Sequence, residues 1–455
     1  MTTPSIAKVA AASGVRLEIS PATAFIDDEL SIRILGLKAR ETVTLHASTE
    51  DDHGRSWSSR ATFSADSSGR VDVASQEPLS GTYRGVSPMG LFWSMNLESA
   101  EEAGRATFVK KNVIANKVTL EVRSAERVVA AARFERSYLA PGTETRDLQV
   151  PGEPATNGMQ TVGRLFLPTG AKASDLLPLV VVLSGSGGGF DLDKAALLAH
   201  HGFAAFALAY FGTPPLPTWL HHIPLEYFEA AFRWLDAQPE VDAQRLGLLA
   251  VSRGAELALL LGSRFPQIRA VVAYAPSSVV WAAGGRDKQN GELPPSWTQG
   301  GAAIPFVPLP LRQFIFRSAI PVALLKRPVM FRELFRAGLR NSKAVAAAAI
   351  PVEQIRGPLM LISSGDDHLW PAEDMSEAIV ARLKRNRFSH CVEHLHYPDA
   401  GHMLRYPFLP TTPRDSRNPH LRNARYSFGG TASADAEAQL ESWRRSIAFI
   451  KTSLT

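Results

Sequence analysis

From about residue 177 to the C-terminus, short apolar runs alternate with segments of helical periodicity, and this alternation constrains the fold more than any other feature. The apolar runs, such as LPLVVVLSG, FAAFALAYF and RLGLLAVS, are nearly continuous, which is typical of strands buried on both faces. Segments with helical periodicity lie between them, such as LEYFEAAFRWLDAQ and RGAELALLLGSR. Buried strands that alternate with helices predict a mainly parallel sheet in an α/β domain.

The first part of the chain, from about Val15 to Arg146, has a different pattern. Short and often alternating runs, among them LSIRILGL, TVTLHAST, TFVKK and KVTLEVRS, are separated by turn signals such as Asp-Asp-His-Gly. We expect an antiparallel, immunoglobulin-like sandwich of about seven strands. The polar stretch TRDLQVPGEPATNGM is predicted to be a linker or turn. We therefore divide the chain into an all-β domain, 1–148, and an α/β domain, 149–455.

Between Trp281 and Ile350 the alternation lapses. This segment contains PLRQFIFRSAIPVALLKRPVMFRELFRAGL, an apolar run with scattered Arg and Lys residues. An insertion between two strands can form a helical cap that lines a substrate site. A peripheral helical excursion or a contact between subunits is the alternative.

Composition argues against several classes of protein. Lys and Arg number 49 against 44 Asp and Glu, a net charge of +5, and the basic residues are scattered, so no nucleic-acid partner is predicted. The single cysteine, Cys391, excludes an internal disulfide and any multi-cysteine zinc site. The pairs His200-His201 and His221-His222 lack acids at ligand spacing, so we expect no metal.

Without a signal-peptide core or a spanning apolar segment, we expect no membrane insertion and a cytoplasmic location.

LLAVSRGAEL, residues 248–257, joins a strand-like run to a helical run at Ser252. A serine held at a sharp strand-to-helix turn in the pattern G-x-S-x-G is the nucleophile elbow of α/β-hydrolases. Here the pattern is Ala250-Val251-Ser252-Arg253-Gly254, with alanine at the first glycine. From these residues alone, an ordinary boundary between a strand and a helix is the alternative.

A serine hydroxyl becomes a nucleophile when a base takes its proton and a third group orients that base. Downstream, LMLISSGDDHLWP ends a strand with Asp366 and Asp367, and YPDAGHML places His402 in a loop after the next strand. The order Ser, Asp, His is the order of this fold. We predict Ser252 as nucleophile, Asp367 as acid and His402 as base, with Asp366 as the alternative acid.

The glycine-rich stretch LSGSGGGF, residues 183–190, follows the strand PLVVV. It lacks the ending of a P-loop and the last glycine of a dinucleotide loop, so no cofactor is predicted. In a hydrolase of this fold, the loop after an early strand and the residue after the nucleophile each supply a backbone N–H to the oxyanion hole. We assign these roles to Ser186, with Gly187 as an alternative, and to Arg253; a flexible glycine turn is the other interpretation.

With these residues in place, the chain resembles the acyl-CoA thioesterase and bile acid-CoA:amino acid N-acyltransferase family. The similarity rests on SWSSRATFSADSSGRVDV, GVSPMGLFWSMNLE, GRLFLPTG, GSGGGF, SRGAEL and YPDAGHMLRYPFLP. It implies a β-sandwich followed by an α/β-hydrolase domain, with the nucleophile, acid and base at Ser252, Asp367 and His402. Within the family, members with serine at the elbow are chiefly hydrolases, whereas those with cysteine lean to acyl transfer onto glycine or taurine. The resemblance therefore implies hydrolysis.

We accordingly expect a serine enzyme that cleaves a small-molecule acyl-CoA thioester through an acyl-enzyme, with no metal or cofactor. Three alternatives are acyl transfer to an amine or alcohol, hydrolysis of a carboxylester without CoA, and a non-catalytic binding protein on the same fold. The chain departs from the family at Ala250 and in the longer, more apolar segment 281–350.

Overall fold

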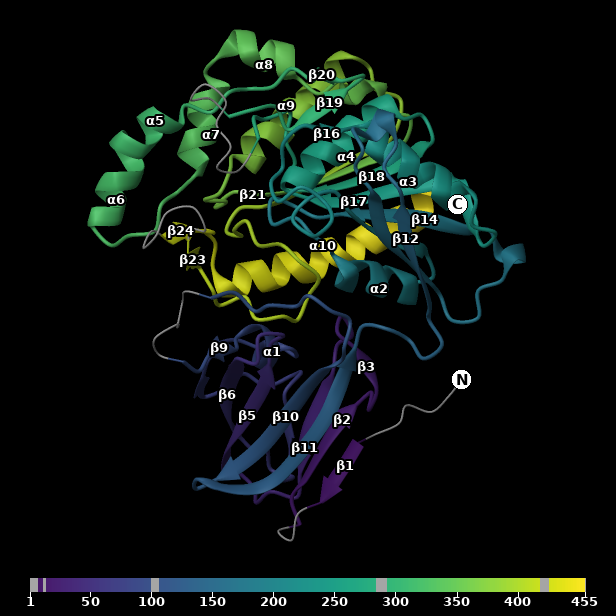
Figure 1. Cartoon of the computed structure of the whole chain (residues 1–455). Coiled ribbons are helices and arrows are strands. Elements are labelled where there is room, and N and C mark those ends of the chain that lie inside the picture. The colour runs from purple at the N-terminus through teal and green to yellow at the C-terminus, as the bar shows by residue number, and fades with distance from the viewer. Residues whose placement is uncertain (1–6, 11–13, 100–105, 284–292, 418–424, 455) are drawn as a thin grey trace. The chain divides into compact units, whose positions relative to one another are not determined.

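The computed structural model describes residues 7–10, 14–99, 106–283, 293–417 and 425–454 (Figure 1). The chain divides into two compact units. Unit 1 comprises Met1–Leu139, Arg405–Ser416 and Thr431–Leu440, and unit 2 comprises Ala140–Leu404, Arg417–Gly430 and Glu441–Thr455.

Unit 1 is built from two β-sheets. The smaller sheet has the order β1 (Ala7–Ala10), β2 (Arg16–Ser20), β4 (Ser31–Leu35) and β7 (Val71–Asp72). The larger sheet has the order β3 (Ala24–Phe25), β11 (Arg127–Ser137), β10 (Asn116–Ser124), β5 (Thr42–Glu50), β6 (Ser56–Ser64) and β8 (Ser80–Gly81), and β9 (Asn96–Leu97) also pairs with β6. A single helical turn, α1 (Gly90–Trp93), precedes β9.

Buried and exposed residues alternate along the longer strands of unit 1. In β5 and β10 every second side chain is buried, which places one face of the sheet in a core. The pairs are antiparallel except for β3 with β11. The predicted all-β sandwich is therefore confirmed. The described strands outnumber the predicted seven in part because β3, β8 and β9 are two-residue pieces too short to show a pattern.

One run predicted to be a strand, TFVKK at 107–111, has no strand conformation. Its carbonyls bond to single groups of the turn after β5: Arg55 Nη2 donates to the carbonyl of Thr107 at 2.7 Å, and the backbone N–H of Asp52 donates to that of Val109 at 3.0 Å. The Phe108 ring packs edge-on against Trp57 at 5.6 Å. The alternation of apolar and polar residues in this run therefore reflects a buried aromatic side chain and not a strand.

The segment 405–416 belongs to unit 1 although it lies far along the chain. The backbone N–H of Thr411 donates to the carbonyl of Trp93 at 2.9 Å. The Thr412 hydroxyl donates to the carbonyl of Met95 at 2.6 Å. These bonds attach the late segment to the turn after α1.

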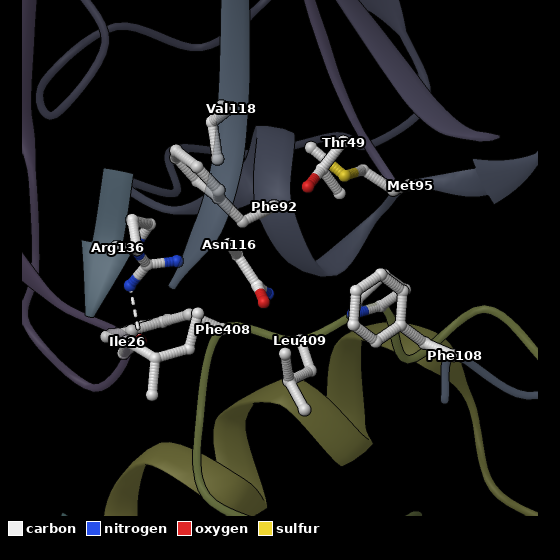
Figure 2. Close-up of a pocket in the computed structure, with 11 residues that line it drawn as sticks. Ile26, Thr49, Phe92, Met95, Phe108, Asn116, Val118, Arg136, Phe408 and Leu409 are labelled. Carbon is white, nitrogen blue, oxygen red and sulfur yellow. Dashed lines mark hydrogen bonds between the residues drawn. The ribbon is translucent and has the colours of Figure 1, made fainter. Parts of the chain in front are cut away.

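Figure 2 shows a small cavity in unit 1. It is lined by Ile26, Thr49, Phe92, Met95, Phe108, Asn116, Val118, Arg136, Phe408, Leu409 and Pro410. The buried guanidinium of Arg136 donates to the carbonyls of Ile26 and Asp28 and lies over the rings of Phe92 and Phe408, at 4.8 and 5.6 Å from their centres. Burial lowers the pKa of Arg136 to about 10, so the group is still charged at neutral pH. The carbonyls and rings provide the compensation that a buried cation requires.

Unit 2 contains an eight-stranded sheet. Its order is β12 (Glu144–Val150), β13 (Thr161–Leu167), β15 (Ala204–Ala209), β14 (Leu177–Leu183), β17 (Val241–Val251), β18 (Ile268–Tyr274), β21 (Leu359–Ser364) and β22 (Val392–Tyr397). The first two pairings are antiparallel, and all pairings from β15 to β22 are parallel. The apolar runs that predicted buried strands form β14, β15, β17, β18 and β21, and the predicted α/β sheet is confirmed.

Helices pack on this sheet along its length. They are α2 (Leu192–His200), α3 (Glu226–Asp236), α4 (Arg253–Arg264), α9 (Ala372–Arg385) and α10 (Ala432–Ser453), the last of which contributes to unit 2 from Glu441 onward. The stretch predicted to be a linker begins inside β12, where Leu148 is buried in the core of unit 2. The division proposed at 148/149 therefore falls within a strand of unit 2.

The segment 281–350 has two parts. Its described first part pairs β19 (Trp297–Gln299) with β20 (Ala302–Ala303) and with β16 (Ile223–Pro224). Its second part is helical: α5 (Leu311–Phe314), a π-helical turn (Ile315–Ala319), α6 (Ile320–Leu324), α7 (Arg332–Leu339) and α8 (Ser342–Ala348). Across the described residues, no helix combines the length and apolar character needed to cross a membrane.

Candidate active site

Ser252 lies at the turn between β17 and α4. Its φ of 57° is in the left-handed region, a strained conformation for a residue with a side chain and the one expected at a nucleophile elbow. Gly254 permits the turn, because a Cβ at this position would lie 2.4 Å from the carbonyl oxygen of Ser184. Ala250, at the position where the pattern usually has glycine, is fully buried within β17 and keeps the parallel register with both neighbouring strands.

His402 lies between the serine and an acid. Its Nε2 is 3.2 Å from the Oγ of Ser252, and its Nδ1 is 2.7 Å from Oδ2 of Asp367. With Nδ1 donating to the carboxylate, Nε2 is left to accept the proton of the serine hydroxyl. All three side chains are buried, and they follow the carboxyl ends of β17, β21 and β22. The structure thus brings together the three residues named from the sequence.

Asp367, rather than Asp366, contacts the histidine. Its second oxygen accepts the backbone N–H groups two and three residues further along, at 2.8 and 3.1 Å. These bonds fix the carboxylate in the orientation that faces His402. Asp366 binds the ring of His368 at 2.9 Å instead.

The backbone groups predicted to form an oxyanion hole lie on two segments. Arg253 is the first residue of α4, where backbone N–H groups have no acceptor within the helix. Gly185 is close to the nucleophile, since a Cβ on it would lie 3.4 Å from the Cβ of Ser252, and Ser186 follows it in an exposed turn. Within the described ranges, the backbone N–H groups of Arg253 and Ser186 donate no hydrogen bond to the protein. Their role in binding an oxyanion stays a prediction.

A buried ion pair beside the nucleophile was not anticipated from the sequence. Nη1 of Arg253 is 2.8 Å from Oε2 of Glu256, and both side chains are buried. Glu256 also accepts the indole N–H of Trp297 at 2.8 Å, and Arg253 donates to the carbonyl of Trp281 at 3.3 Å and to the hydroxyl of Ser296. Burial raises the pKa of Glu256, and the charge of Arg253 opposes that effect.

This pair attaches the beginning of the 281–350 segment to the helix that carries the nucleophile. The sequence signal for it is an Arg and a Glu spaced i, i+3 in the otherwise apolar helix RGAELALLL. Charged residues are almost never fully buried unless they are paired, so two charges in this buried helix indicate a pair.

We expect Glu256→Gln to lower the free energy of unfolding by about 3 kcal/mol or more, because it leaves the Arg253 cation buried without its counter-ion. Glutamine still offers an acceptor to Trp297. Denaturant unfolding measures the loss. The control is Asp374→Asn, which removes an exposed pair with Arg336 at 3.0 Å and is expected to cost at most about 1 kcal/mol. Similar small losses in both variants would contradict the expectation.

The order of the strands and the serine turn after β17 define unit 2 as an α/β-hydrolase fold. Two family models match the chain: the acyl-CoA thioester hydrolase/BAAT N-terminal region at residues 27–150, and the BAAT / acyl-CoA thioester hydrolase C terminal at residues 223–455. The chain belongs to the acyl-CoA thioester hydrolase/BAAT family, and the predicted resemblance is confirmed.

The proteins that are similar to this chain include N-acyltransferases and thioesterases by name. Bile acid-CoA:amino acid N-acyltransferase of Mus musculus is 30% identical over 96% of this chain and 98% of its own length. Acyl-coenzyme A thioesterase 1 of Rattus norvegicus is 31% identical over 94% of each chain. Peroxisomal succinyl-coenzyme A thioesterase of Mus musculus is 29% identical over 93% of each chain.

Proposed function

We propose that this chain hydrolyses acyl-CoA thioesters to a free acid and CoA. The observation that carries the proposal is the hydrogen-bonded series from Ser252 through His402 to Asp367. The names of the similar proteins support it, because thioesterases and N-acyltransferases alike act on an acyl group carried by CoA.

In the first half-reaction, Oγ of Ser252 attacks the thioester carbonyl while Nε2 of His402 accepts its proton. Asp367 holds the imidazole in the required tautomer and stabilises the imidazolium. The backbone N–H groups of Arg253 and Ser186 donate to the oxyanion of the tetrahedral intermediate. Collapse of that intermediate breaks the C–S bond, and the leaving CoA thiolate takes the proton from His402.

The second half-reaction releases the acyl group. Water attacks the ester on Ser252 while His402 again accepts a proton, and the same two backbone donors bind the oxyanion. The serine regains its proton from His402 as the free acid leaves. Only protein groups and water take part in these steps.

We assign the 281–350 segment a role in shaping the acyl side of the site. A row of aromatic rings runs from this segment to the catalytic histidine. Trp281 contacts Phe335 at 4.9 Å, Phe335 contacts Trp370 at 5.6 Å, and Trp370 lies edge-on to the ring of His402 at 6.4 Å. These contacts favour the predicted cap over a peripheral excursion, because only the ring of Trp370 lies between Phe335 of this segment and the ring of His402 in this row.

Product analysis separates hydrolysis from its two enzymatic alternatives. With an acyl-CoA substrate we expect free acid at a rate unchanged by added glycine, taurine or an alcohol, because Ser252 stands where transferring family members have cysteine. An N-acyl or O-acyl product that grows with acceptor concentration would favour acyl transfer. Faster turnover of a simple carboxylester than of the matching thioester would favour esterase activity. Mass spectrometry of the products measures all three.

A further inference from the structure

Four large apolar side chains are exposed on one short helical segment of unit 2. On the π-helical turn, on α6 and directly after it, the exposed fractions are 72% for Phe316, 42% for Ile320, 79% for Leu324 and 67% for Leu325. We call these four residues the apolar stripe. Elsewhere in the described chain, large apolar side chains with similar exposure are scattered: Leu79, Val86, Ile114, Val128 and Leu176.

The stripe lies on the face of the segment that does not pack on the protein. Phe316, Ile320 and Leu324 are spaced four residues apart, which aligns them along one side of a helix. The other side is anchored, because Phe314 and Ala319 are buried in a small apolar cluster with nearby residues. Figure 1 shows α5 and α6 at the periphery of unit 2, away from the strands of the sheet. The segment therefore has two sets of apolar side chains: one set packs in the apolar cluster of unit 2, and the stripe is exposed to solvent.

Basic residues accompany the stripe along the sequence, and acidic residues are missing from this part of the sequence. Arg312, Arg317, Lys326 and Arg327 are all exposed. Within the described ranges, none of the four forms an ion pair. No Asp or Glu occurs between Glu292 and Glu333. We call these four residues the basic rim.

We propose that the apolar stripe and basic rim dock on the surface of an anionic lipid bilayer. Apolar side chains on one helix face that enter the boundary between headgroups and acyl chains, together with cations that pair with anionic headgroups, are the two attractions that hold a protein at such a surface. The charge argues against a second copy of this chain as the occupant. A symmetric contact through this patch would bring two basic rims together, and like charges repel.

Binding of the full chain to vesicles tests the proposal. We expect co-sedimentation with vesicles of phosphatidylcholine and phosphatidylserine, weaker binding to phosphatidylcholine alone, and weaker binding at high ionic strength. Phe316→Ser with Leu324→Ser should reduce partitioning about a hundredfold, or about tenfold per side chain. Arg317→Gln with Lys326→Gln should reduce it about fivefold per residue and flatten the salt dependence.

Variants at exposed apolar residues outside the apolar stripe show whether vesicle binding depends on the stripe itself or on any exposed apolar side chain. Leu176→Ser and Val128→Ser, at 51% and 50% exposure, should bind as the wild-type chain does. Thermal unfolding shows whether each variant is folded. If the variant with two serines does not fold, the variant with two glutamines tests the proposal.

Three outcomes would overturn the proposal. They are no binding of the wild-type chain to anionic vesicles, an equal loss in the Leu176 control, or a dimer in light scattering that the double serine variant dissociates. The measurement uses no turnover, so its failure is distinct from failure of the thioesterase proposal.

Discussion

Ser252→Ala is expected to lower kcat/KM for an acyl-CoA thioester by roughly 10⁴- to 10⁶-fold, with the fold retained. The hydroxyl that forms the acyl-enzyme is lost, whereas the backbone donors of the oxyanion hole remain and support a residual rate. Alanine also keeps the backbone of the elbow in place, because only one oxygen atom is removed. Steady-state kinetics with a thiol-detecting reagent measures the released CoA.

The control for this variant is Ser263→Ala. Ser263 lies on α4, the helix that begins next to Ser252, and each of the two serines is 8% exposed. Its hydroxyl donates to the carbonyl of Leu260 at 2.8 Å, near the opposite end of α4 from Ser252. We expect a change in kcat/KM of less than about threefold, since no reacting atom is removed. Equal turnover by the wild-type chain and the Ser252 variant would refute the serine mechanism.

Asp367→Asn is expected to reduce kcat by about 10⁴-fold. The amide keeps the shape of the carboxylate but offers an N–H to the imidazole, which favours the wrong tautomer of His402 for accepting the serine proton. It also removes the negative charge that stabilises the imidazolium in the transition state. The measurement is kcat across the neutral pH range.

The neighbouring carboxylate supplies a matched control. Asp366→Asn changes the adjacent residue in the same loop, whose side chain binds His368. We expect less than a tenfold loss, because its carboxylate does not contact His402. If the losses were reversed, with Asp366 as the sensitive position, Asp367 would be the wrong acid.

The candidate site was accessible from the sequence because its parts are local signals at strand ends. Ser252 sits between an apolar run and a helical run, and Asp367 and His402 follow two later runs. In a parallel sheet the carboxyl ends of neighbouring strands lie at one edge, so order along the chain predicts proximity. The structure places the side chains within hydrogen-bonding distance.

Features that depend on distant partners were not accessible in this way. The segment 107–111 alternates like a strand, but its carbonyls bond to the Arg55 side chain and to the backbone N–H of Asp52 in one turn, and not to a neighbouring strand. The polar stretch after residue 144 resembles a linker until β13 pairs with it. The pattern of residues within one segment does not show which other segment will pair with it. Whether such a segment becomes a strand therefore depends on its tertiary contacts.

The attachment of residues 405–416 to unit 1 has a consequence for folding during synthesis. Phe408 and Leu409 form part of the wall of the cavity in which Arg136 lies (Figure 2). These residues leave the ribosome only after 140–404, nearly the whole of unit 2, have been made. N-terminal domains commonly fold first during translation. Here the first unit to emerge stays incomplete until the chain is almost finished, because Thr431–Leu440 also belongs to it. His402 is synthesised only three residues before Arg405, where the first of the two late segments of unit 1 begins.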